Sequence, residues 1–247
     1  MVWNLRSIAD DLAGLVLPSC CPACGLVAQG HRRPWCQVCA PPVEHKWVRP
    51  TPAPAGFPMT ARCGIYADPL RAGILAYKDG TRRDLGGDFG RALAGAVLWG
   101  GWQARPVLVP VPSTLRARRG RGFDHALDLA RRTQLNLPGS TVCRPLVVGR
   151  TANDRGGMSA AERATDTGAF RMTGMSARRV AELADTGPIV VVDDVATSGW
   201  TLARAAGVLR RGGLPVAGAV VVASTLLRGG AQIDGFEEFF PGGADGG

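Results

Sequence analysis

The chain has 247 residues, of which 46% are hydrophobic and 20% charged, so it is long enough for one full domain plus a small module and too apolar for a disordered chain. Its formal net charge of +9, supplied mostly by arginine, favours phosphate-bearing ligands, although arginine-rich chains also occur without a polyanionic ligand. No apolar run approaches the ~20 residues that span a bilayer, and Asp10 and Asp11 interrupt the apolar core that a secretory signal needs, so we expect a soluble cytoplasmic protein.

The N-terminal part of the chain predicts three short segments ahead of the main domain. Apolar residues recur at helical spacing in residues 4–16, which predicts an amphipathic helix within residues 1–18. Two C-x-x-C pairs come next. Prolines are then frequent in residues 40–58, where they deny the backbone both hydrogen-bond donors and helical geometry. We therefore predict a zinc-ribbon module with a proline-rich linker, or an extended arm, over residues 19–58.

The cysteine pairs have the spacing of a structural metal site. Each C-x-x-C knuckle places two thiolates within reach of one tetrahedral ion, so we expect a four-cysteine zinc site. Its ligands are Cys21, Cys24, Cys36 and Cys39. Incidental or redox-active cysteines are the alternative, but a thioredoxin-like role would need a strand before the motif and a helix after it. Cys20 and His31 are alternative ligands, and Cys63 and Cys143 are expected in the core.

Basic and aromatic residues flank the cysteine pairs. They are His31, Arg32, Arg33, Trp35 and Lys46. Such a flank suits single-stranded DNA, because bases stack on aromatic rings and phosphates pair with cations. The simpler interpretation, which we favour, is that Trp35 packs the small module while the charges face water.

Strand-like and helix-like segments alternate in the rest of the chain. The predicted strands are residues 62–66, 106–111, 144–148, 189–192 and 216–223, and the predicted helices are residues 70–78, 85–99, 124–133 and 201–211. This alternation predicts an α/β domain over residues 59–228, in which helices flank a Rossmann-like parallel sheet. Residues 149–163 have little apolar content and predict a mobile loop, and residues 229–247 predict a flexible tail.

The residues that follow the strand 189–192 supply the groups that a phosphorylated sugar and its metal require. Asp193 and Asp194 stand at the carboxyl end of a buried strand, where open α/β sheets bind their ligands. A short turn from Ala196 to Gly199 then leads into a helix whose N-terminus can bind phosphate. The two carboxylates can accept hydrogen bonds from a sugar diol or hold Mg²⁺ through water. The alternative is that Asp194 caps the helix and the turn is ordinary.

This segment resembles the signature of the type I phosphoribosyltransferases, which bind 5-phosphoribosyl 1-pyrophosphate (PRPP). The signature is a hydrophobic run, two acids, a short apolar pair and Thr-x-Gly-x-Thr, and it is matched here up to Thr201. The resemblance implies catalytic roles for Asp193 and Asp194, which would contact the ribose hydroxyls. It also implies a cradle for the 5′-phosphate. That cradle consists of Ala196, Thr197, Ser198, Gly199, Trp200 and Thr201.

An arginine-rich turn follows the predicted strand 106–111. Guanidinium groups pair well with phosphate oxygens, so this turn suits a pyrophosphate, and a solvated basic loop is the alternative. The residues that we expect to contact PRPP here are Pro112, Ser113, Arg116 and Arg121.

The order of these motifs resembles the ComF family. Tyr-Lys-Asp-Gly at residues 77–80, Arg-Gly-Phe-Asp at residues 121–124 and the segments 157–163 and 168–170 fit its pattern, as do the cysteine pairs. The resemblance implies a type I phosphoribosyltransferase fold and a link to competence and DNA uptake. It implies PRPP or a phosphoribosyl nucleotide as ligand, with single-stranded DNA or DNA-uptake proteins as partners.

Three hypotheses for function follow. The chain is a Mg²⁺-dependent transferase that moves a phosphoribosyl group to a nitrogen nucleophile, a PRPP- or nucleotide-binding protein without turnover, or an accessory protein that handles single-stranded DNA. Arg155 stands where ComF relatives often have glutamine, and Thr165 or Asp166 where they often have asparagine, so the resemblance implies PRPP binding more directly than turnover. Arg150, Arg155 and Arg163 are candidates to close on the pyrophosphate, with a solvated surface role as the alternative.

Overall fold

The computed structural model describes residues 20–27, 34–113, 119, 122–149, 170–174 and 177–225. The sequence predictions that fall outside these residues are the helix 4–16, the alternative ligand His31 with Arg32 and Arg33 of the basic flank, Arg116, Arg121, the loop with Arg150, Arg155 and Arg163, and the tail 229–247. Within the described ranges, no helix combines the length and the hydropathy that crossing a membrane requires.

A six-stranded sheet forms the centre of the fold, in the order β1-β2-β8-β7-β3-β4. Its strands are β1 (Lys46–Val48), β2 (Thr60–Arg62), β3 (Val107–Pro110), β4 (Thr141–Val142), β7 (Ile189–Ala196) and β8 (Val216–Ser224). Neighbouring strands are parallel, except that β1 runs antiparallel to β2 at one edge. The predicted α/β class with a mostly parallel central sheet is therefore confirmed.

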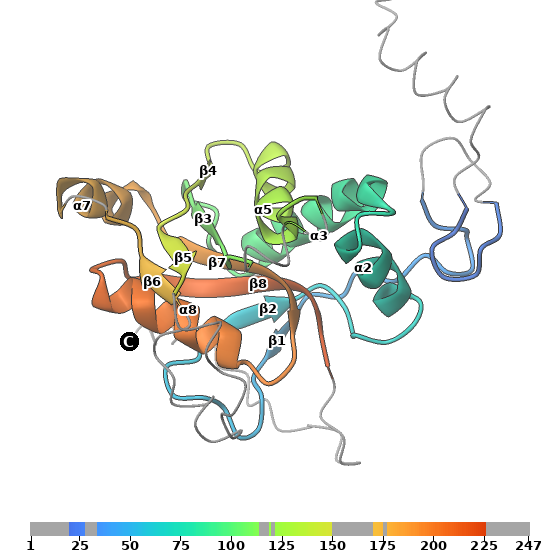
Figure 1. Cartoon of the computed structure of the whole chain (residues 1–247), viewed down its shortest axis with the longest axis horizontal. Helices are drawn as coiled ribbons and strands as arrows, with labels where there is room; N and C mark the ends of the chain where they lie inside the picture. Colours follow the sequence, from blue (N-terminus) through green and yellow to red (C-terminus); the bar gives the residue numbers. More distant parts are fainter. Residues whose placement is uncertain are drawn as a thin grey trace, which may run out of the picture.

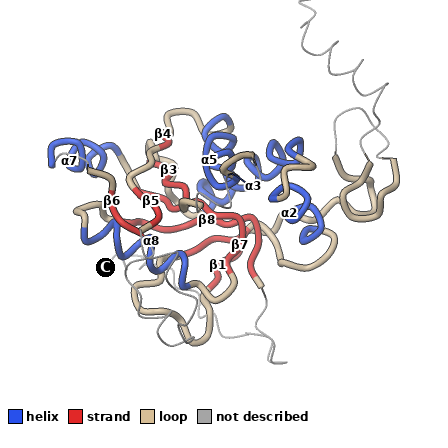
Figure 2. The backbone as a smooth tube through the Cα atoms, viewed as in Figure 1, coloured by secondary structure: helices blue, strands red, loops and turns tan. Residues whose placement is uncertain are grey.

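Helices cover both faces of this sheet. They are α2 (Leu70–Lys78), the short 3-10 helix η1 (Arg83–Leu85), α3 (Gly86–Trp99), α5 (His125–Leu135), α7 (Ala177–Thr186) and α8 (Trp200–Arg211). Figure 1 shows α2, α3 and α5 on one side of the sheet and α8 on the other. A small antiparallel sheet of β5 (Leu146–Val148) and β6 (Phe170–Met172) lies beside α8, as the tube view also shows (Figure 2).

Alternation along the central strand β7 builds two separate hydrophobic cores. Val190 and Val192 pack on the side of α2, α3 and α5, where Leu129 is also fully buried. Val191 points to the opposite face and packs with Leu202 of α8. Because successive side chains of a strand point to opposite faces, a run of β-branched residues with no polar interruption requires helices on both sides. The same alternation starts the side chains of Asp193 and Asp194, which follow this run, on opposite faces of β7. One carboxylate oxygen of each nevertheless lies within 4.8 Å of the other.

Most predicted helices agree with the structure, and the structure refines two predictions elsewhere in the chain. The predicted strand 62–66 is only partly right, because β2 ends at Arg62 and the chain then follows β8 irregularly, with Ser224 N–H donating to Gly64 O and Tyr66 N–H to Ser224 O. The proline-rich residues 40–58 are not only a linker, since they contain β1. The proline-free stretch of β1 leaves its backbone groups available to pair with β2.

Candidate functional site

The carboxyl ends of β2, β8, β7 and β3 lie along one edge of the sheet, which is where parallel α/β sheets bind their ligands. β7 brings Asp193 and Asp194 to this edge, and both side chains are buried. A buried carboxylate is unfavourable unless charges or hydrogen bonds compensate it. The surroundings of the two acids therefore determine what this edge can bind.

Two basic side chains meet the carboxylate of Asp194. Lys78 Nζ, at the end of α2, lies 2.9 Å from Asp194 Oδ2, and His125 Nε2, at the start of α5, lies 3.0 Å from the same oxygen. Asp194 is 6% exposed, Lys78 25% and His125 10%. Burial alone would raise the pKa of Asp194, but His125 and Lys78 hold it below its ordinary value. Asp194 is therefore an anion fixed between two helices.

Asp193 has different surroundings. The backbone N–H of Asp194 donates to Asp193 Oδ1 at 2.9 Å, which holds this carboxylate against the backbone of the next residue. Burial, together with the negative charge of Asp194, raises the pKa of Asp193 to about 7. The pKa values of the two neighbouring acids are thus shifted in opposite directions, and a cation arriving at this edge would favour the charged form of Asp193.

His125, Asp193 and Asp194 each have one potential metal-ligand atom, and these three atoms lie within 4.8 Å of one another. Two carboxylates and one imidazole at this spacing can hold a divalent cation, and carboxylate oxygens are the ligands that Mg²⁺ prefers. The two carboxylates therefore fit the predicted Mg²⁺, whereas an imidazole nitrogen is a more usual ligand of transition metals. Lys78 shares Asp194 with this set, so a cation bound to Asp194 would have to compete with the ammonium group.

His125 links this edge to the turn after β3, and the sequence analysis did not single it out. Its Nδ1 lies 3.3 Å from Ser113 Oγ, so the predicted pyrophosphate turn and the acids of β7 are joined through one imidazole. Asp124, the N-cap of α5, accepts from Leu127 N–H at 3.4 Å and so fixes where the helix begins. An available signal was the Asp-His pair at the start of a helix that follows an arginine-rich turn.

Tyr77 of α2 contacts the first turn of α5, next to His125. Its hydroxyl donates to Asp128 Oδ2 at 2.7 Å and lies 3.3 Å from His125 O, and its ring is fully buried between Phe89 and Phe123. Burial and the hydrogen bond to Asp128 raise the pKa of Tyr77, so this side chain stays a neutral donor. The Tyr-Lys pair of α2 therefore has two roles: Tyr77 fixes α5, and Lys78 contacts Asp194.

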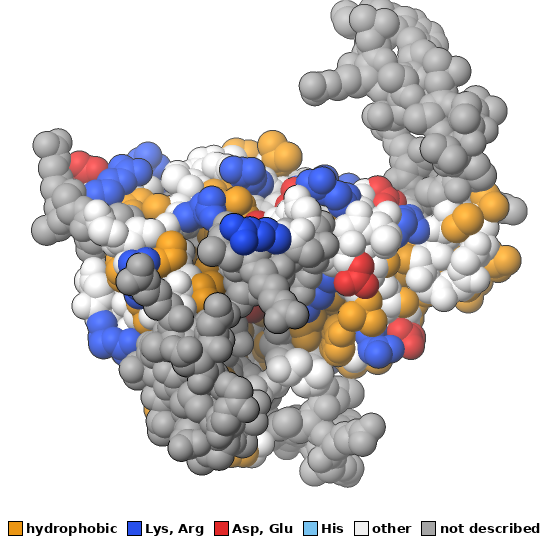
Figure 3. Space-filling view, viewed as in Figure 1, with side chains coloured by type: hydrophobic (Ala, Val, Ile, Leu, Met, Phe, Trp, Pro, Cys, Tyr) orange, Lys and Arg blue, Asp and Glu red, His pale blue; other side chains and the backbone are white. Residues whose placement is uncertain are grey.

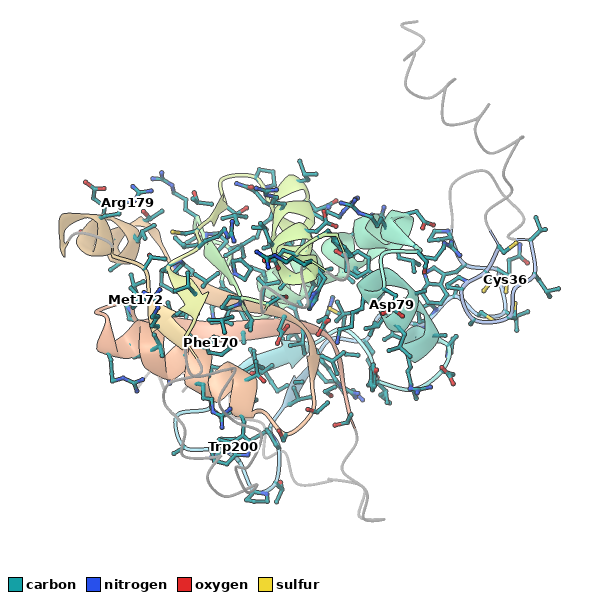
Figure 4. All side chains as sticks on the ribbon, viewed as in Figure 1. Cys36, Asp79, Phe170, Met172, Arg179 and Trp200 are labelled. Carbon is teal, nitrogen blue, oxygen red and sulfur yellow. The ribbon has the colours of Figure 1, made fainter. Side chains whose placement is uncertain are left out.

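The turn between β7 and α8 presents an uncapped helix N-terminus. Gly199 is the N-cap, with φ of +76° and no side-chain cap, so the alternative that Asp194 caps α8 is wrong. Thr197, Ser198 and Thr201 are exposed, and Trp200 stands at the first position of the helix (Figure 4). Exposed hydroxyls beside unpaired backbone N–H groups can bind a phosphate.

The proline-rich arm before β2 packs directly on this turn. A Cβ on Gly199 would lie 2.6 Å from Pro50 Cγ and 2.7 Å from the ring of Phe57. Arg210 of α8 also donates to Gly56 O at 2.7 Å. Gly199 is therefore required both for its left-handed backbone and for the close approach of the arm. Ala196, at the start of the turn, is buried rather than open to a ligand.

The residues after β3 are only partly described. Pro112 and Ser113 are half-buried at the same edge as β7, whereas Arg116 and Arg121 lie outside the described residues. Val111 N–H donates to Val192 O at 3.0 Å, so the chain leaves β3 directly beside the acids. The structure thus brings together Ser113, His125 and the two acids, while the arginine part of the predicted pyrophosphate turn stays a prediction.

The four cysteines of the two knuckles form a compact cluster, and Figure 4 shows sulfur atoms gathered around Cys36 at the far end from α7. Their sulfur atoms all lie within 4.8 Å of one another, and Cys24 Sγ and Cys36 Sγ are 3.7 Å apart. Sulfurs around a tetrahedral zinc ion at about 2.3 Å are about 3.8 Å apart, so the cluster can hold a structural metal such as zinc. Cys20 is not part of this cluster, and Cys63 is buried in the core as expected.

The cysteine cluster is tied to the main domain rather than separate from it. Trp35 is only 6% exposed, and a Cβ on Gly73 of α2 would lie 2.2 Å from its ring. Arg82, just before η1, donates to the backbone oxygens of Cys20 and Pro34. Trp35 therefore packs against α2, and its ring is not available for stacking on nucleic-acid bases.

Two comparisons with known proteins gave no match. No protein-family model matches the chain, and no curated protein gives a significant match. What the chain does is therefore inferred from the sheet edge, the α8 turn and the cysteine cluster themselves.

Proposed function

We propose that this chain is a ComF-like protein of the type I phosphoribosyltransferase fold that binds PRPP with Mg²⁺, and that its cysteine cluster holds structural zinc. The observation that carries the proposal is the pair of buried acids at the end of β7, followed directly by the uncapped N-terminus of α8. A ribose diol would donate hydrogen bonds to Asp193 and Asp194. The phosphate of the same ligand would bind at Thr197, Ser198 and Thr201, in the turn that follows these acids.

The surrounding residues support a ligand that carries both phosphate and metal. Mg²⁺, when bound, would neutralise part of the charge of a pyrophosphate leaving group. Asp193 would bind that cation as a carboxylate, because a neighbouring positive charge lowers a carboxyl pKa. Lys78 and His125 would keep Asp194 charged and oriented, and Ser113 would present its hydroxyl beside the pyrophosphate. Transfer to a nitrogen nucleophile is the reaction that this arrangement would serve, and binding without turnover is the alternative.

The single-stranded DNA hypothesis receives less support. Trp35 is buried, and on the face shown in Figure 3 the Lys and Arg side chains of the described residues are spread over the surface rather than gathered into one track. Sequence-independent binding of single strands uses exposed aromatic rings along a basic groove. We therefore favour a small phosphorylated ligand over a polynucleotide.

A ligand-induced stability assay tests the proposal. Thermal unfolding is measured with Mg²⁺ plus PRPP, Mg²⁺ plus ribose 5-phosphate, and Mg²⁺ plus single-stranded oligonucleotide. We expect PRPP to raise Tm most, because binding to the folded state alone stabilises it by mass action. A rise with the oligonucleotide only, which disappears at high salt, would favour the DNA hypothesis instead. Pyrophosphate release from PRPP in the presence of a nucleobase would then distinguish transfer from binding.

A further inference from the structure

Arg62, the last residue of β2, is a buried charge without sufficient partners. It is 6% exposed, and among the described residues neither its Nε nor its Nη1 has a hydrogen-bond partner. Burial lowers the pKa of Arg62, and the charge that counteracts this is Glu44. The carboxylate of Glu44, however, is engaged by Lys46, whose Nζ lies 2.6 Å from Glu44 Oε1. Unsatisfied donors on a buried guanidinium are unfavourable, and Nε and Nη1 find no partner among the described residues, so an oxyanion from a ligand would stabilise this side chain.

The register of the sheet places Arg62 on the ligand-binding edge. Arg62 is paired with Val221 of β8, and Val221 is paired with Asp193 of β7, so the three form one row across the sheet. Two strand spacings separate the backbones of Arg62 and Asp193, which is about 10 Å. This is the length of a ribose together with a small ring beside it.

Side-chain alternation shows which face Arg62 occupies. Its neighbours Ala61 and Cys63 belong to the core beneath α2 and α3, so Arg62 points to the opposite face. Val221 packs on that face with α8. Arg62 therefore lies on the same side of the sheet as the N-terminus of α8, at the same edge.

The local charge also favours an anion. Lys46 of β1 is directly opposite Arg62 in the antiparallel pair, and like charges in that position repel each other. Glu44 supplies one negative charge against these two cations, so among the described residues this end of β1 and β2 keeps an excess positive charge. An oxyanion would satisfy the guanidinium donors and remove the excess charge at once.

The geometry points to Arg62 as the residue that binds an oxyanion of the ligand, and specifically to an acceptor substrate that carries a carboxylate or phosphate group next to its reacting nitrogen. This inference rests on the proposed PRPP site, because the acceptor is placed relative to the ribose at Asp193. The phosphate of PRPP itself is the other source of an oxyanion with the same chemistry, and the experiment separates the two.

The test uses pairs of probes that differ only in the charged group. Orotate and uracil, anthranilate and aniline, inorganic phosphate, and PRPP with Mg²⁺ are each titrated by calorimetry into the wild type, Arg62→Met and Arg62→Lys. Arg91→Met is the matched control, because Arg91 is an exposed arginine of α3 whose partner is Asp88. Thermal unfolding of each variant without ligand is measured in parallel.

We expect the wild type to bind at least one carboxylated probe tenfold or more tightly than its uncharged counterpart. Arg62→Met should weaken that binding at least tenfold, Arg62→Lys should weaken it less, and Arg91→Met should leave it unchanged. Arg62→Met should also unfold at the same or a higher temperature than the wild type, because it removes buried unsatisfied donors. A loss of PRPP affinity in Arg62→Met, with no effect on the carboxylated probes, would assign the oxyanion to PRPP.

Two results would overturn the inference. One is that the wild type binds none of the oxyanion probes, PRPP included. The other is that Arg62→Met binds every probe as the wild type does while its Tm falls, which would make Arg62 a structural residue. If PRPP fails to bind but orotate, anthranilate or phosphate binds in an Arg62-dependent way, the proposed function fails and the oxyanion site stands.

Discussion

The contact between Lys78 and Asp194 predicts that Lys78→Met strongly destabilises the protein. Lys78 Nζ lies 2.9 Å from a carboxylate that is 6% exposed, so the substitution leaves a buried negative charge with His125 as its remaining basic neighbour. Removing one partner of a buried ion pair costs about 3–5 kcal/mol. Because His125 remains and Lys78 is itself 25% exposed, we expect the lower end of this range, about 3 kcal/mol. In a chain of this length that lowers Tm by roughly 6–12 °C.

A second lysine–carboxylate pair, exposed rather than buried, tests whether the loss of stability depends on burial or on the distance between the charges. Lys46 Nζ lies 2.6 Å from Glu44 Oε1, closer than Lys78 to Asp194, but both side chains are more than half exposed. Exposed ion pairs contribute little because water and salt screen them, so Lys46→Met should change Tm only slightly. Thermal and urea unfolding, followed by circular dichroism without ligand, measure both variants. Equal losses in Lys78→Met and Lys46→Met would refute the reasoning, since burial would then have no effect.

Three further predictions follow from the metal cluster, the acids and the α8 turn. We expect metal analysis to find one equivalent of zinc in the wild type and in Cys143→Ser but not in Cys36→Ser, and full zinc in Cys36→Ser would contradict the cluster. The pKa of Asp193 is raised to about 7 in the folded protein. Between about pH 4 and 7 the folded protein therefore keeps a proton on Asp193 that the unfolded chain has released. The free energy of unfolding consequently falls as the pH rises through that window. The wild type should therefore lose more unfolding free energy between pH 5 and 8 than Asp193→Asn, and parallel pH curves would refute this. Gly199→Ala should lower Tm more than Gly139→Ala. Both glycines have positive φ, but a Cβ at Gly199 would collide with Pro50 and Phe57, whereas a Cβ at Gly139 would meet only Arg105 Cγ at 3.9 Å. Equal losses of Tm would show that the packing of Pro50 and Phe57 does not matter.

The elements that could be predicted from the sequence are those whose pattern is local. The β-branched run ending at Asp193 predicted β7, because a strand buried on both faces has no polar interruption, and α2 was predicted with its observed bounds. β1 was missed because its three residues become a strand only by pairing with β2, a contact that no local pattern encodes. The α7 segment was missed even though Val180, Leu183 and Ala184 recur at helical spacing, because most of its other residues are polar.

The candidate site likewise contains residues that a local motif predicts and residues that only the tertiary structure brings together. Asp193, Asp194 and the α8 turn are consecutive in the chain, so the motif could place them together. His125 and Lys78 reach Asp194 only because α5 and α2 pack on one face of the sheet, and Arg62 joins them only through the register of β2 and β8. These contacts depend on helix packing and strand pairing between distant segments, which neither composition nor spacing determines.

The central claim, that this sheet edge binds PRPP with Mg²⁺, is tested most directly by calorimetric titration. PRPP is titrated with and without Mg²⁺ into the wild type, Asp193→Asn, Asp194→Asn and the control Asp185→Asn, whose side chain lies on the exposed surface of α7. We predict saturable binding of one PRPP per chain that requires Mg²⁺, is retained in Asp185→Asn, and weakens at least tenfold in each of the other two variants. No binding by the folded wild type, or equal binding by all four proteins, would contradict the account.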